Sequence, residues 1–220
     1  AGRVAADQEA LCGDVQLVHA RGTGDQVNDD FFLRVDDQLR NRLGTPPISY
    51  STYQLGKDGG FGGFDYPAAG DRMEFLLEAS LNASQLYQDS RDEGIAELVA
   101  YLNHRTAQCP GEMYVLTGHS QGADVTGRAL AELSNGILDR IAFVALFGDP
   151  RFQTYNTQVI AFVDQCYFPR PVWQRGTSEC YSHGWYADDF APYLPDAILD
   201  RVGSWCRDGD VACNGPVVWR

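Results

Sequence analysis

The chain has 220 residues, of which 44% are hydrophobic and 21% are charged. This length and composition are typical of a globular protein, and we expect a single domain over residues 1–220. Asp and Glu outnumber Lys and Arg by 30 to 17, so the net charge is -13. Such a charge argues against binding to nucleic acid or to an anionic membrane surface. No apolar run approaches the roughly 18 residues that a transmembrane helix needs.

The cysteines indicate an oxidising compartment. Their number is even and none stands in a Cys-x-x-Cys pair, which argues against zinc ribbons and thioredoxin-like redox sites. Disulfides are the favoured interpretation, and six buried free thiols in a cytosolic protein are the alternative. Counting does not choose among the possible pairings. The first seven residues have no basic stretch followed by an apolar one, so a secretion signal, if the protein is secreted, has already been removed. The six are Cys12, Cys109, Cys166, Cys180, Cys206 and Cys213.

The first elements alternate between strands and helices. Residues 15–20 are mostly apolar and β-branched and predict a strand, which a glycine-containing turn at 21–24 ends. Apolar residues spaced by four predict a partly helical segment over 27–43, and 48–55 is a second strand candidate. Residues 56–70 contain six glycines and interleaved aromatic residues. They predict a surface loop anchored by its aromatic side chains, in preference to a mobile rim beside a site.

The second half continues the alternation. Ser90 and Glu93 have the spacing of a capping box, so we expect a helix to begin there and to end near Cys109. Strands are predicted at 113–117 and 141–147, with a helix over 123–133 between them. Residues 151–200 show little periodicity, and a last short strand is predicted at 201–205. Apolar strands that alternate with helices indicate an α/β protein in which helices cover both faces of a parallel sheet.

The pentapeptide at 118–122 carries the chemistry. Gly118-His119-Ser120-Gln121-Gly122 fits Gly-x-Ser-x-Gly, in which a serine stands on a sharp strand-to-helix turn. A predicted strand directly before Ser120 and a predicted helix after it favour this nucleophile elbow over a glycine-rich turn without a catalytic task. The backbone N–H of Gln121 would then point at the oxyanion of the reaction.

Two further segments are candidates for the same site. Arg21-Gly22-Thr23 follows the first strand, where a second oxyanion donor usually lies, and Thr23 has a hydroxyl to offer. Asp210 stands between Cys206 and Cys213, and a short disulfide loop would present its carboxylate rigidly to a catalytic histidine. Taken alone, Arg21-Gly22-Thr23 is as easily a simple turn as an oxyanion loop. An aspartate in a stretch like that around Asp210 is more often a solvated turn residue than a catalytic one.

Together, these motifs resemble the cutinase family, which includes acetylxylan esterases. The resemblance covers residues 12–213 and implies a three-layer α/β-hydrolase with a central, mainly parallel five-stranded sheet and no true lid. It also implies that Ser120 is the nucleophile, that Asp210 is the triad acid, and that Thr23 and the backbone of Gln121 form the oxyanion hole. The disulfides that it implies are Cys12–Cys109 and Cys206–Cys213, which leaves Cys166 to pair with Cys180.

The sequence departs from the family in two ways. Residues 151–200 form a longer, irregular, insert-rich segment that carries the extra cysteine pair. The family also places its histidine beyond the last cysteine, where residues 214–220 contain none. We therefore expect the natural chain to continue past Arg220 and to supply this histidine. His183, in the insert, is the weaker alternative because it would break the Ser, Asp, His chain order of this class.

The other three histidines are not expected to act as the base. The side chain of His119 should project away from the neighbouring hydroxyl. His19 lies in the first strand and predicts a packed, hydrogen-bonded core role. His104 lies in the helix after Ser90 and predicts a surface position.

The sequence therefore predicts a secreted serine esterase that forms an acyl-enzyme on Ser120. Its substrates are cutin-like polyesters, lipids with short acyl esters, or acetylated polysaccharide such as xylan. We expect no cofactor, no metal, no nucleic-acid partner, no transmembrane segment and a monomer. The alternative is a catalytically silent relative that binds a polyester or a glycan. Labelling of Ser120 by a fluorophosphonate distinguishes the two.

Overall fold

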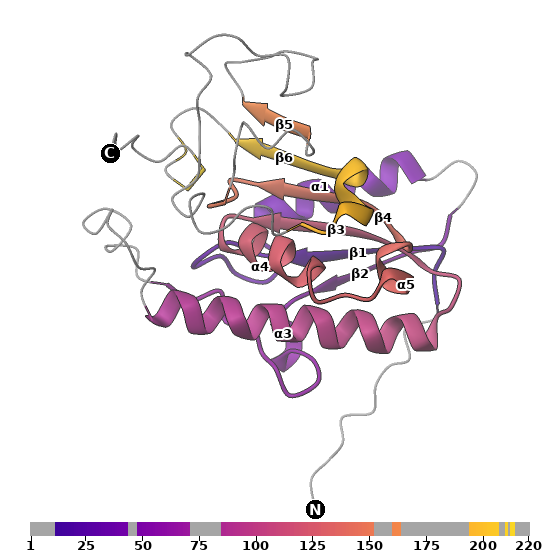
Figure 1. Cartoon of the computed structure of the whole chain (residues 1–220), viewed down its shortest axis with the longest axis horizontal. Coiled ribbons are helices and arrows are strands. Elements are labelled where there is room, and N and C mark those ends of the chain that lie inside the picture. Colours follow the sequence, from indigo (N-terminus) through magenta and orange to yellow (C-terminus); the bar gives the residue numbers. More distant parts are fainter. Residues whose placement is uncertain are drawn as a thin grey trace, which may run out of the picture.

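A parallel sheet of six strands forms the centre of the molecule (Figure 1). The computed structural model describes residues 12–43, 48–70, 85–151, 194–206, 210 and 212–213, together with the backbone of residues 160–163. The strand order is β2-β1-β3-β4-β6-β5, and every neighbouring pair is parallel. The strands are β1 (Val15–Ala20), β2 (Tyr50–Gln54), β3 (Met113–His119), β4 (Ile141–Phe147), β5 (Ile160–Val163) and β6 (Val202–Cys206).

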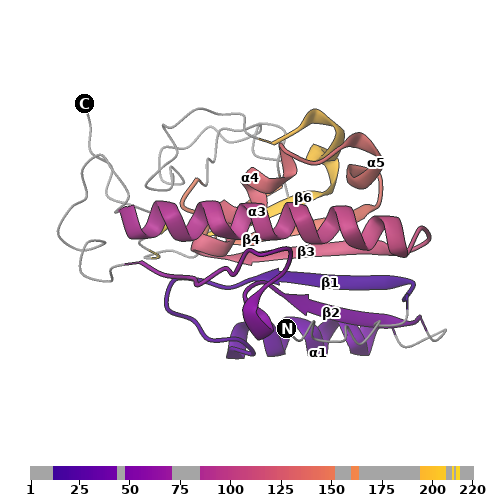
Figure 2. The same cartoon turned by 90° about the horizontal axis from the view of Figure 1, so that it is seen from below.

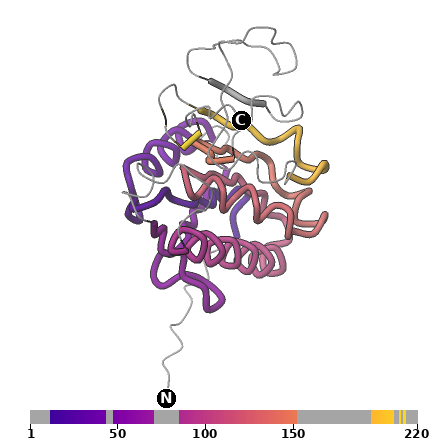
Figure 3. Tube along the Cα trace, turned by 60° about the vertical axis from the view of Figure 1, so that its left-hand side comes forward, coloured from indigo at the N-terminus to yellow at the C-terminus, as the bar shows by residue number. Residues whose placement is uncertain are grey.

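Helices cover both faces of this sheet. Figure 2 shows α4 and α5 on one face and α1 on the other. The tube in Figure 3 shows the long helix α3 lying against the segment that contains α4. The helices are α1 (Asp30–Leu43), α3 (Gln85–Gln108), α4 (Gln121–Leu130) and α5 (Asn135–Leu138), with 3-10 turns at Lys57–Gly59 and Asp196–Arg201.

The main core lies between the sheet and the face covered by α3 and α4. Val18 and Leu116 point to it from β1 and β3, and Leu98, Leu102 and Val125 meet them from the two helices. Their burial removes the apolar stripe of each element from water, which is the main favourable contribution to folding. In the part of the chain that the structure describes, no helix is long and apolar enough to cross a membrane.

The predicted three-layer α/β class is confirmed, and the apolar runs at 15–20 and 141–147 form β1 and β4 with the predicted bounds. The structure adds an edge strand, β5, inside the segment that showed little periodicity, so the sheet has six strands where the resemblance implied five. An edge strand of four residues is too short to leave a clear alternation in the sequence.

Three helix boundaries differ from the prediction. Helix α1 begins later than residue 27 because Asp29 caps it: the Phe32 N–H donates to Asp29 Oδ1 at 2.7 Å. Helix α3 begins at Gln85, so the predicted capping box at Ser90 lies inside the helix and is wrong as a helix start. A further short helix, α5, begins at residue 135, just after the predicted end of the preceding helix. It forms there because its apolar side chains at 137 and 138 are buried.

The loop at 56–70 is anchored as predicted, but not by aromatic side chains alone. Tyr66 is fully buried, and Phe61 packs edge-on against Tyr101 of α3. The buried carboxylate of Glu97 also holds the loop, because it accepts hydrogen bonds from the backbone N–H groups of Gly56 and Tyr66. Burial raises the pKa of Glu97, and these hydrogen bonds oppose that shift.

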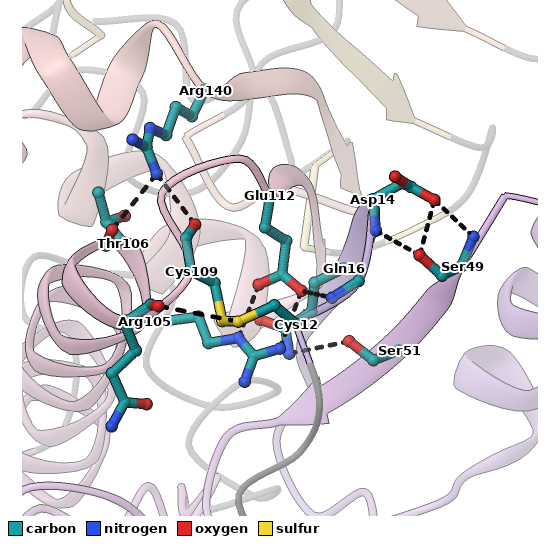
Figure 4. Close-up of a disulfide and its surroundings, with 12 residues drawn as sticks. Cys12, Asp14, Gln16, Ser49, Ser51, Arg105, Thr106, Cys109, Glu112 and Arg140 are labelled. Atoms are coloured by element: carbon teal, nitrogen blue, oxygen red, sulfur yellow. Dashed lines mark hydrogen bonds and ion pairs between the residues drawn. A yellow bond between two sulfur atoms is a disulfide. The ribbon is translucent and has the colours of Figure 1, made fainter.

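The amino-terminal edge of the sheet is tied by a disulfide and a buried ion pair (Figure 4). Cys12, before β1, is bonded to Cys109, after α3, with a Cα–Cα distance of 5.4 Å. Beside it the buried Glu112 receives two hydrogen bonds from the Arg105 guanidinium, at 2.6 and 2.8 Å, and one from the Gly13 N–H at 2.8 Å. A carboxylate with this many donors fixes the chain before β1 to the turn before β3.

Candidate active site

The carboxyl ends of the parallel strands bring the candidate residues to one edge of the sheet. Thr23 follows β1, Ser120 follows β3, Gly148 follows β4 and Asp210 follows β6. In Figure 1 the arrowheads of β4, β5 and β6 point to this side. Ligand sites of open α/β sheets form outside these carboxyl ends, where loops from neighbouring strands meet.

Ser120 sits on a strained turn between β3 and α4. Its backbone has φ 51° and ψ −118°, a conformation that a residue with a Cβ rarely adopts. Such strain costs about 1–3 kcal/mol and persists only where the surroundings impose it. The Ser120 N–H donates to the Phe147 carbonyl at 2.8 Å, and its hydroxyl makes no capping hydrogen bond to the helix. The hydroxyl is therefore presented at the sheet edge rather than used to stabilise the helix.

The two flanking glycines are required by close backbone contacts. A Cβ on Gly118 would lie 2.3 Å from the Gly122 carbonyl oxygen. A Cβ on Gly122 would lie 2.0 Å from the Ala20 carbonyl oxygen, at the end of β1. The elbow thus packs directly onto the neighbouring strand, which explains the pattern of glycines around the serine.

The side chain of Gln121 anchors the elbow to the interior of the protein. It is fully buried, and its Oε1 lies 3.0 Å from both the Tyr66 and the Ser90 hydroxyls. Its Nε2 donates to the Ala69 carbonyl at 2.9 Å. The first N–H groups of a helix have no intrahelical partner, so a fixed Gln121 holds a backbone donor at the amino end of α4. The positive end of the helix dipole favours negative charge at the same place.

Thr23 supplies an unused hydroxyl on the neighbouring loop. Its Oγ1 is buried and has no hydrogen-bond partner among the described residues. Buried polar atoms are nearly always paired, so an unpaired one at a candidate site needs an explanation. A substrate oxyanion would be a suitable acceptor for it. The Gly24 N–H donates to the Ala68 carbonyl at 2.8 Å, which fixes the loop on the other side of Thr23.

The carboxylate of Asp210 lies at the end of β4. A Cβ on Gly148 would stand 2.9 Å from Asp210 Oδ2, so the carboxylate packs against the residue directly after Phe147. Because Phe147 accepts the Ser120 N–H, the serine and the carboxylate occupy neighbouring strand ends. Asp210 Oδ1 also accepts the Ala212 N–H at 2.9 Å.

The structure contains the two disulfides that the resemblance implied, Cys12–Cys109 and Cys206–Cys213. The second closes a short loop with a Cα–Cα distance of 5.7 Å at the end of β6. Asp210 stands inside this loop. Cys166 and Cys180 lie outside the described residues, so their pairing stays a prediction.

Three histidines have positions in the structure, and none of them forms a hydrogen bond with the Ser120 hydroxyl. His19 is buried, with Nδ1 2.9 Å from Thr117 Oγ1, which confirms the predicted core role. His104 is exposed on α3, as predicted, and its ring lies against Phe61. The Nδ1 atom of His119 lies 3.0 Å from the Asp25 carboxylate. His183 lies outside the described residues.

Asp124 fixes the elbow helix to the following loop. It is fully buried in the first turn of α4 and pairs with Arg151 at 2.7 Å and with Arg128 at 2.9 Å. Burial raises the pKa of Asp124, and the charges of Arg151 and Arg91 oppose this. The ion pair with Arg151 therefore ties the first turn of α4 to the chain after β4. Among the described residues, no three His, Cys, Asp or Glu side chains come close enough together to hold a metal ion.

Comparison with known proteins agrees with this geometry. The sequence profile of the cutinase family matches residues 11–220. The chain belongs to the cutinase family. A cutinase of Coprinopsis cinerea is 31% identical over 213 residues, which cover 94% of this chain and 74% of that protein. A cutinase of Blumeria hordei is 26% identical over 93% of this chain.

The lengths and the solved structures add two facts. The chain spans 62% of the Blumeria cutinase and 52% of a carboxylesterase of Mycobacterium tuberculosis that is 30% identical over 145 residues. An acetyl xylan esterase structure superposes with a TM-score of 0.64 at 20% identity and covers 94% of this chain and 88% of its own. At this identity the superposition supports the cutinase fold alone.

Sequence reasoning missed several residues that shape the site. Asp25, Ser90 and Glu97 contact it or its supporting loops, and each has a partner that lies 31 or more residues away in the chain. The spacing of Ser90 and Glu93 draws attention to both residues, but by itself it predicts a helix cap. In the structure the Ser90 hydroxyl accepts the Ala69 N–H and Glu93 accepts the Asp65 N–H.

Proposed function

We propose that this protein is a secreted serine esterase that hydrolyses carboxylic esters through an acyl-enzyme on Ser120. One observation carries the proposal: a strained serine and an unpaired, buried Thr23 hydroxyl follow the carboxyl ends of the paired strands β3 and β1. Membership of the cutinase family supports the same chemistry. The two disulfides support an oxidising, extracellular location.

The reaction proceeds in two halves. The Ser120 Oγ attacks the ester carbonyl carbon while a histidine takes its proton. The oxyanion accepts hydrogen bonds from the Gln121 N–H and the Thr23 hydroxyl, then collapses and expels the alcohol, which receives the proton from the imidazolium. Water attacks the acyl-enzyme by the same route and releases the acid. Asp210 orients the imidazole, and no cofactor enters either half.

The base is a histidine outside the described residues. In the described part of the chain, none of His19, His104 and His119 forms a hydrogen bond with the Ser120 hydroxyl, so none of them is assigned to this role. The family pattern puts the base after Cys213, and His183 is the alternative within this sequence. If His183→Ala abolishes turnover of the 220-residue chain, His183 is the base. If that variant keeps its activity, the base is not in the insert.

We expect the protein to accept only some classes of ester. The acidic surface disfavours anionic polymers, so we propose uncharged substrates: a cutin-like polyester, short acylglycerols or acetylated xylan. We further propose that residues 1–220 act as one domain and one monomer, with a site open to solvent. An open site predicts smooth saturation with p-nitrophenyl butyrate rather than a jump at the substrate's solubility limit.

A fluorophosphonate probe tests the proposal. Ser120 should be labelled, peptide mapping should locate the adduct, and Ser120→Ala should lose both labelling and hydrolysis while keeping its melting temperature. The competing proposal is a silent protein that binds a polyester or glycan. Its motive is that none of the three described histidines forms a hydrogen bond with Ser120. It predicts no labelling, together with retention of the intact protein on a polyester film or on xylan.

A further inference from the structure

An aspartate–histidine pair stands on the solvent side of the elbow. His119 is the last residue of β3, directly before Ser120, and its side chain is 36% exposed. Its Nδ1 lies 3.0 Å from Asp25 Oδ2, and its ring stacks on Phe31 of α1 at 5.1 Å between centroids. An ionised carboxylate only accepts hydrogen bonds, so Nδ1 carries the proton and donates it to Asp25.

The same carboxylate binds the loop that carries Thr23. Asp25 Oδ2 accepts the Gly22 N–H at 3.1 Å, and the Asp25 N–H donates to the Gly22 carbonyl at 3.0 Å. The contact is tight, because a Cβ on Gly22 would lie 2.6 Å from Asp25 Oδ2 and 2.7 Å from His119 Nδ1. One oxygen of Asp25 therefore joins the end of β3 to the loop after β1.

A second contact, which is buried, also holds the loop that carries Thr23. The Tyr66 hydroxyl lies 2.8 Å from the Arg21 carbonyl and 3.0 Å from Gln121 Oε1. The two contacts hold the two ends of one peptide group, because the Arg21 carbonyl accepts from Tyr66 and the Gly22 N–H donates to Asp25. Through Tyr66 and Asp25 they bind the loop to residues 121 and 119, which flank the nucleophile. The buried contact sets the position of Arg21, and the half-exposed one sets the position of Gly22.

From this arrangement we infer that Asp25 and His119 are positioning residues that hold the Thr23 hydroxyl at hydrogen-bond distance from the oxyanion. The inference rests on the proposed function, because it assigns a task within that reaction. An oxyanion donor contributes fully only when it stands about 3 Å from the developing charge, so a loop that moves by 1 Å weakens transition-state binding. Substrate binding in the ground state does not depend on this donor in the same way.

A set of matched variants separates the hydrogen bond from the packing. His119→Phe keeps a ring against Phe31 but loses Nδ1, whereas His119→Asn loses the ring but places an amide nitrogen where Nδ1 stood. Asp25→Ala removes the acceptor. His104→Phe, on the exposed face of α3, is the control for the same substitution away from the site.

The inference predicts a specific kinetic pattern with p-nitrophenyl butyrate. His119→Phe and Asp25→Ala should each lower kcat about 10- to 100-fold and leave KM within about twofold. The double variant should lose no more than the worse single variant, and His119→Asn should recover most of kcat. In a Thr23→Val background, His119→Phe should have a severalfold smaller effect. Unchanged kcat in both single variants, or losses that multiply in the double variant, would overturn the inference.

Amide hydrogen exchange tests the geometry without relying on catalysis. The Gly22 N–H should exchange at least about tenfold faster in His119→Phe than in the parent, although its acceptor Asp25 is still present. It should stay protected in His119→Asn, and the amide of Leu17 in β1 serves as the internal reference. If Gly22 exchange is unchanged in His119→Phe, the inference is wrong. If Ser120→Ala hydrolyses esters as well as the parent does, the proposed function fails, and the exchange data still decide on the pair.

Discussion

The two edges of the sheet hold opposite kinds of contacts. At the amino-terminal edge, a disulfide joins residues 97 apart and a buried ion pair satisfies the Glu112 carboxylate (Figure 4). At the carboxyl-terminal edge, Ser120 has a positive φ and Thr23 has a buried hydroxyl without a partner. The same strands thus run from a disulfide and a satisfied ion pair at one end to a strained serine and an unpaired Thr23 hydroxyl at the other. Strain at a site persists only because the rest of the fold imposes it.

The two disulfides differ in the same way. Cys12–Cys109 spans a sequence separation of 97, whereas Cys206–Cys213 spans 7. The stabilisation by a disulfide grows with the length of the loop that it closes, so the first contributes more to the free energy of unfolding. The second closes the loop that contains Asp210, and its main effect is on the shape of the site. Changes at the two edges should therefore separate stability from turnover.

The largest expected effect is on catalysis at the carboxyl-terminal edge. Ser120→Ala should lower kcat by about 10⁴- to 10⁶-fold, because the reaction then has no nucleophile. Its melting temperature should stay within a few degrees of the parent, since the hydroxyl makes no capping hydrogen bond. Hydrolysis of p-nitrophenyl butyrate and a thermal scan measure the two. Retained hydrolysis would remove Ser120 from the mechanism.

The second prediction concerns the amino-terminal edge. Cys12→Ala/Cys109→Ala should lower the free energy of unfolding by about 4–5 kcal/mol, because a loop of nearly a hundred residues is no longer closed in the unfolded chain. Well below its new melting temperature, the variant should keep the parent kcat. Urea titration and initial rates provide the measurements. A large loss of kcat in the folded variant would contradict the separation of the two edges.

The third prediction returns to the oxyanion hole. Thr23→Val keeps the shape of the side chain but removes the hydroxyl, and it should lower kcat about 10²-fold, which corresponds to about 3 kcal/mol. Thr23→Ser keeps the hydroxyl and is the matched control. KM should change little in either variant. Equal rates for the valine and serine variants would show that the hydroxyl has no part in the reaction.

The fourth prediction uses the short disulfide. Cys206→Ala/Cys213→Ala should lower the free energy of unfolding by about 2–2.5 kcal/mol, less than the loss of Cys12–Cys109. Unlike that variant, it should also lower kcat, because Asp210 loses the loop that presents it. Urea titration measures the loss of unfolding free energy, and initial rates measure the loss of kcat. A variant with reduced stability and parental kcat would mean that the loop does not need its disulfide to position Asp210.

The smallest expected effect belongs to His19, which lies near the catalytic edge but serves stability. Burial lowers the pKa of His19, and the carboxylate of Asp29 opposes this only in part. The unfolded chain therefore takes up the proton first as the pH falls through about 6.5, and the folded state loses stability there. The slope from one such group is at most about 1.4 kcal/mol per pH unit.

The variant His19→Asn isolates this contribution. It keeps a nitrogen near Thr117 but does not titrate, so its unfolding free energy should depend less on pH between about 7 and 5 than that of the parent. Urea titrations at several pH values measure the difference. Identical slopes for the two proteins would contradict the assignment.

Local sequence patterns were sufficient for most of the strands and for the candidate nucleophile. The strand Ile141–Phe147 follows from a continuous apolar run and Val15–Ala20 from a mostly apolar one, and such runs indicate strands buried on both faces. Ser120 follows from its flanking glycines, because only glycine permits the close contacts of this turn. These signals lie within a few residues of the feature that they predict, so no knowledge of the fold is needed to find them.

Tertiary structure alone decided the contacts that shape the site. The pairing of Asp25 with His119 joins residues 94 apart, and that of Tyr66 with Gln121 joins residues 55 apart. Ser90 illustrates the difficulty, because its spacing from Glu93 matches a helix cap while its hydroxyl bonds to Gln121 in the folded chain. A polar side chain bonds to whichever donor or acceptor the fold brings near, and strand order sets that proximity. The sequence by itself therefore determined the elbow and its candidate nucleophile, and the packing of β1 against β3 determined which side chains lie around it.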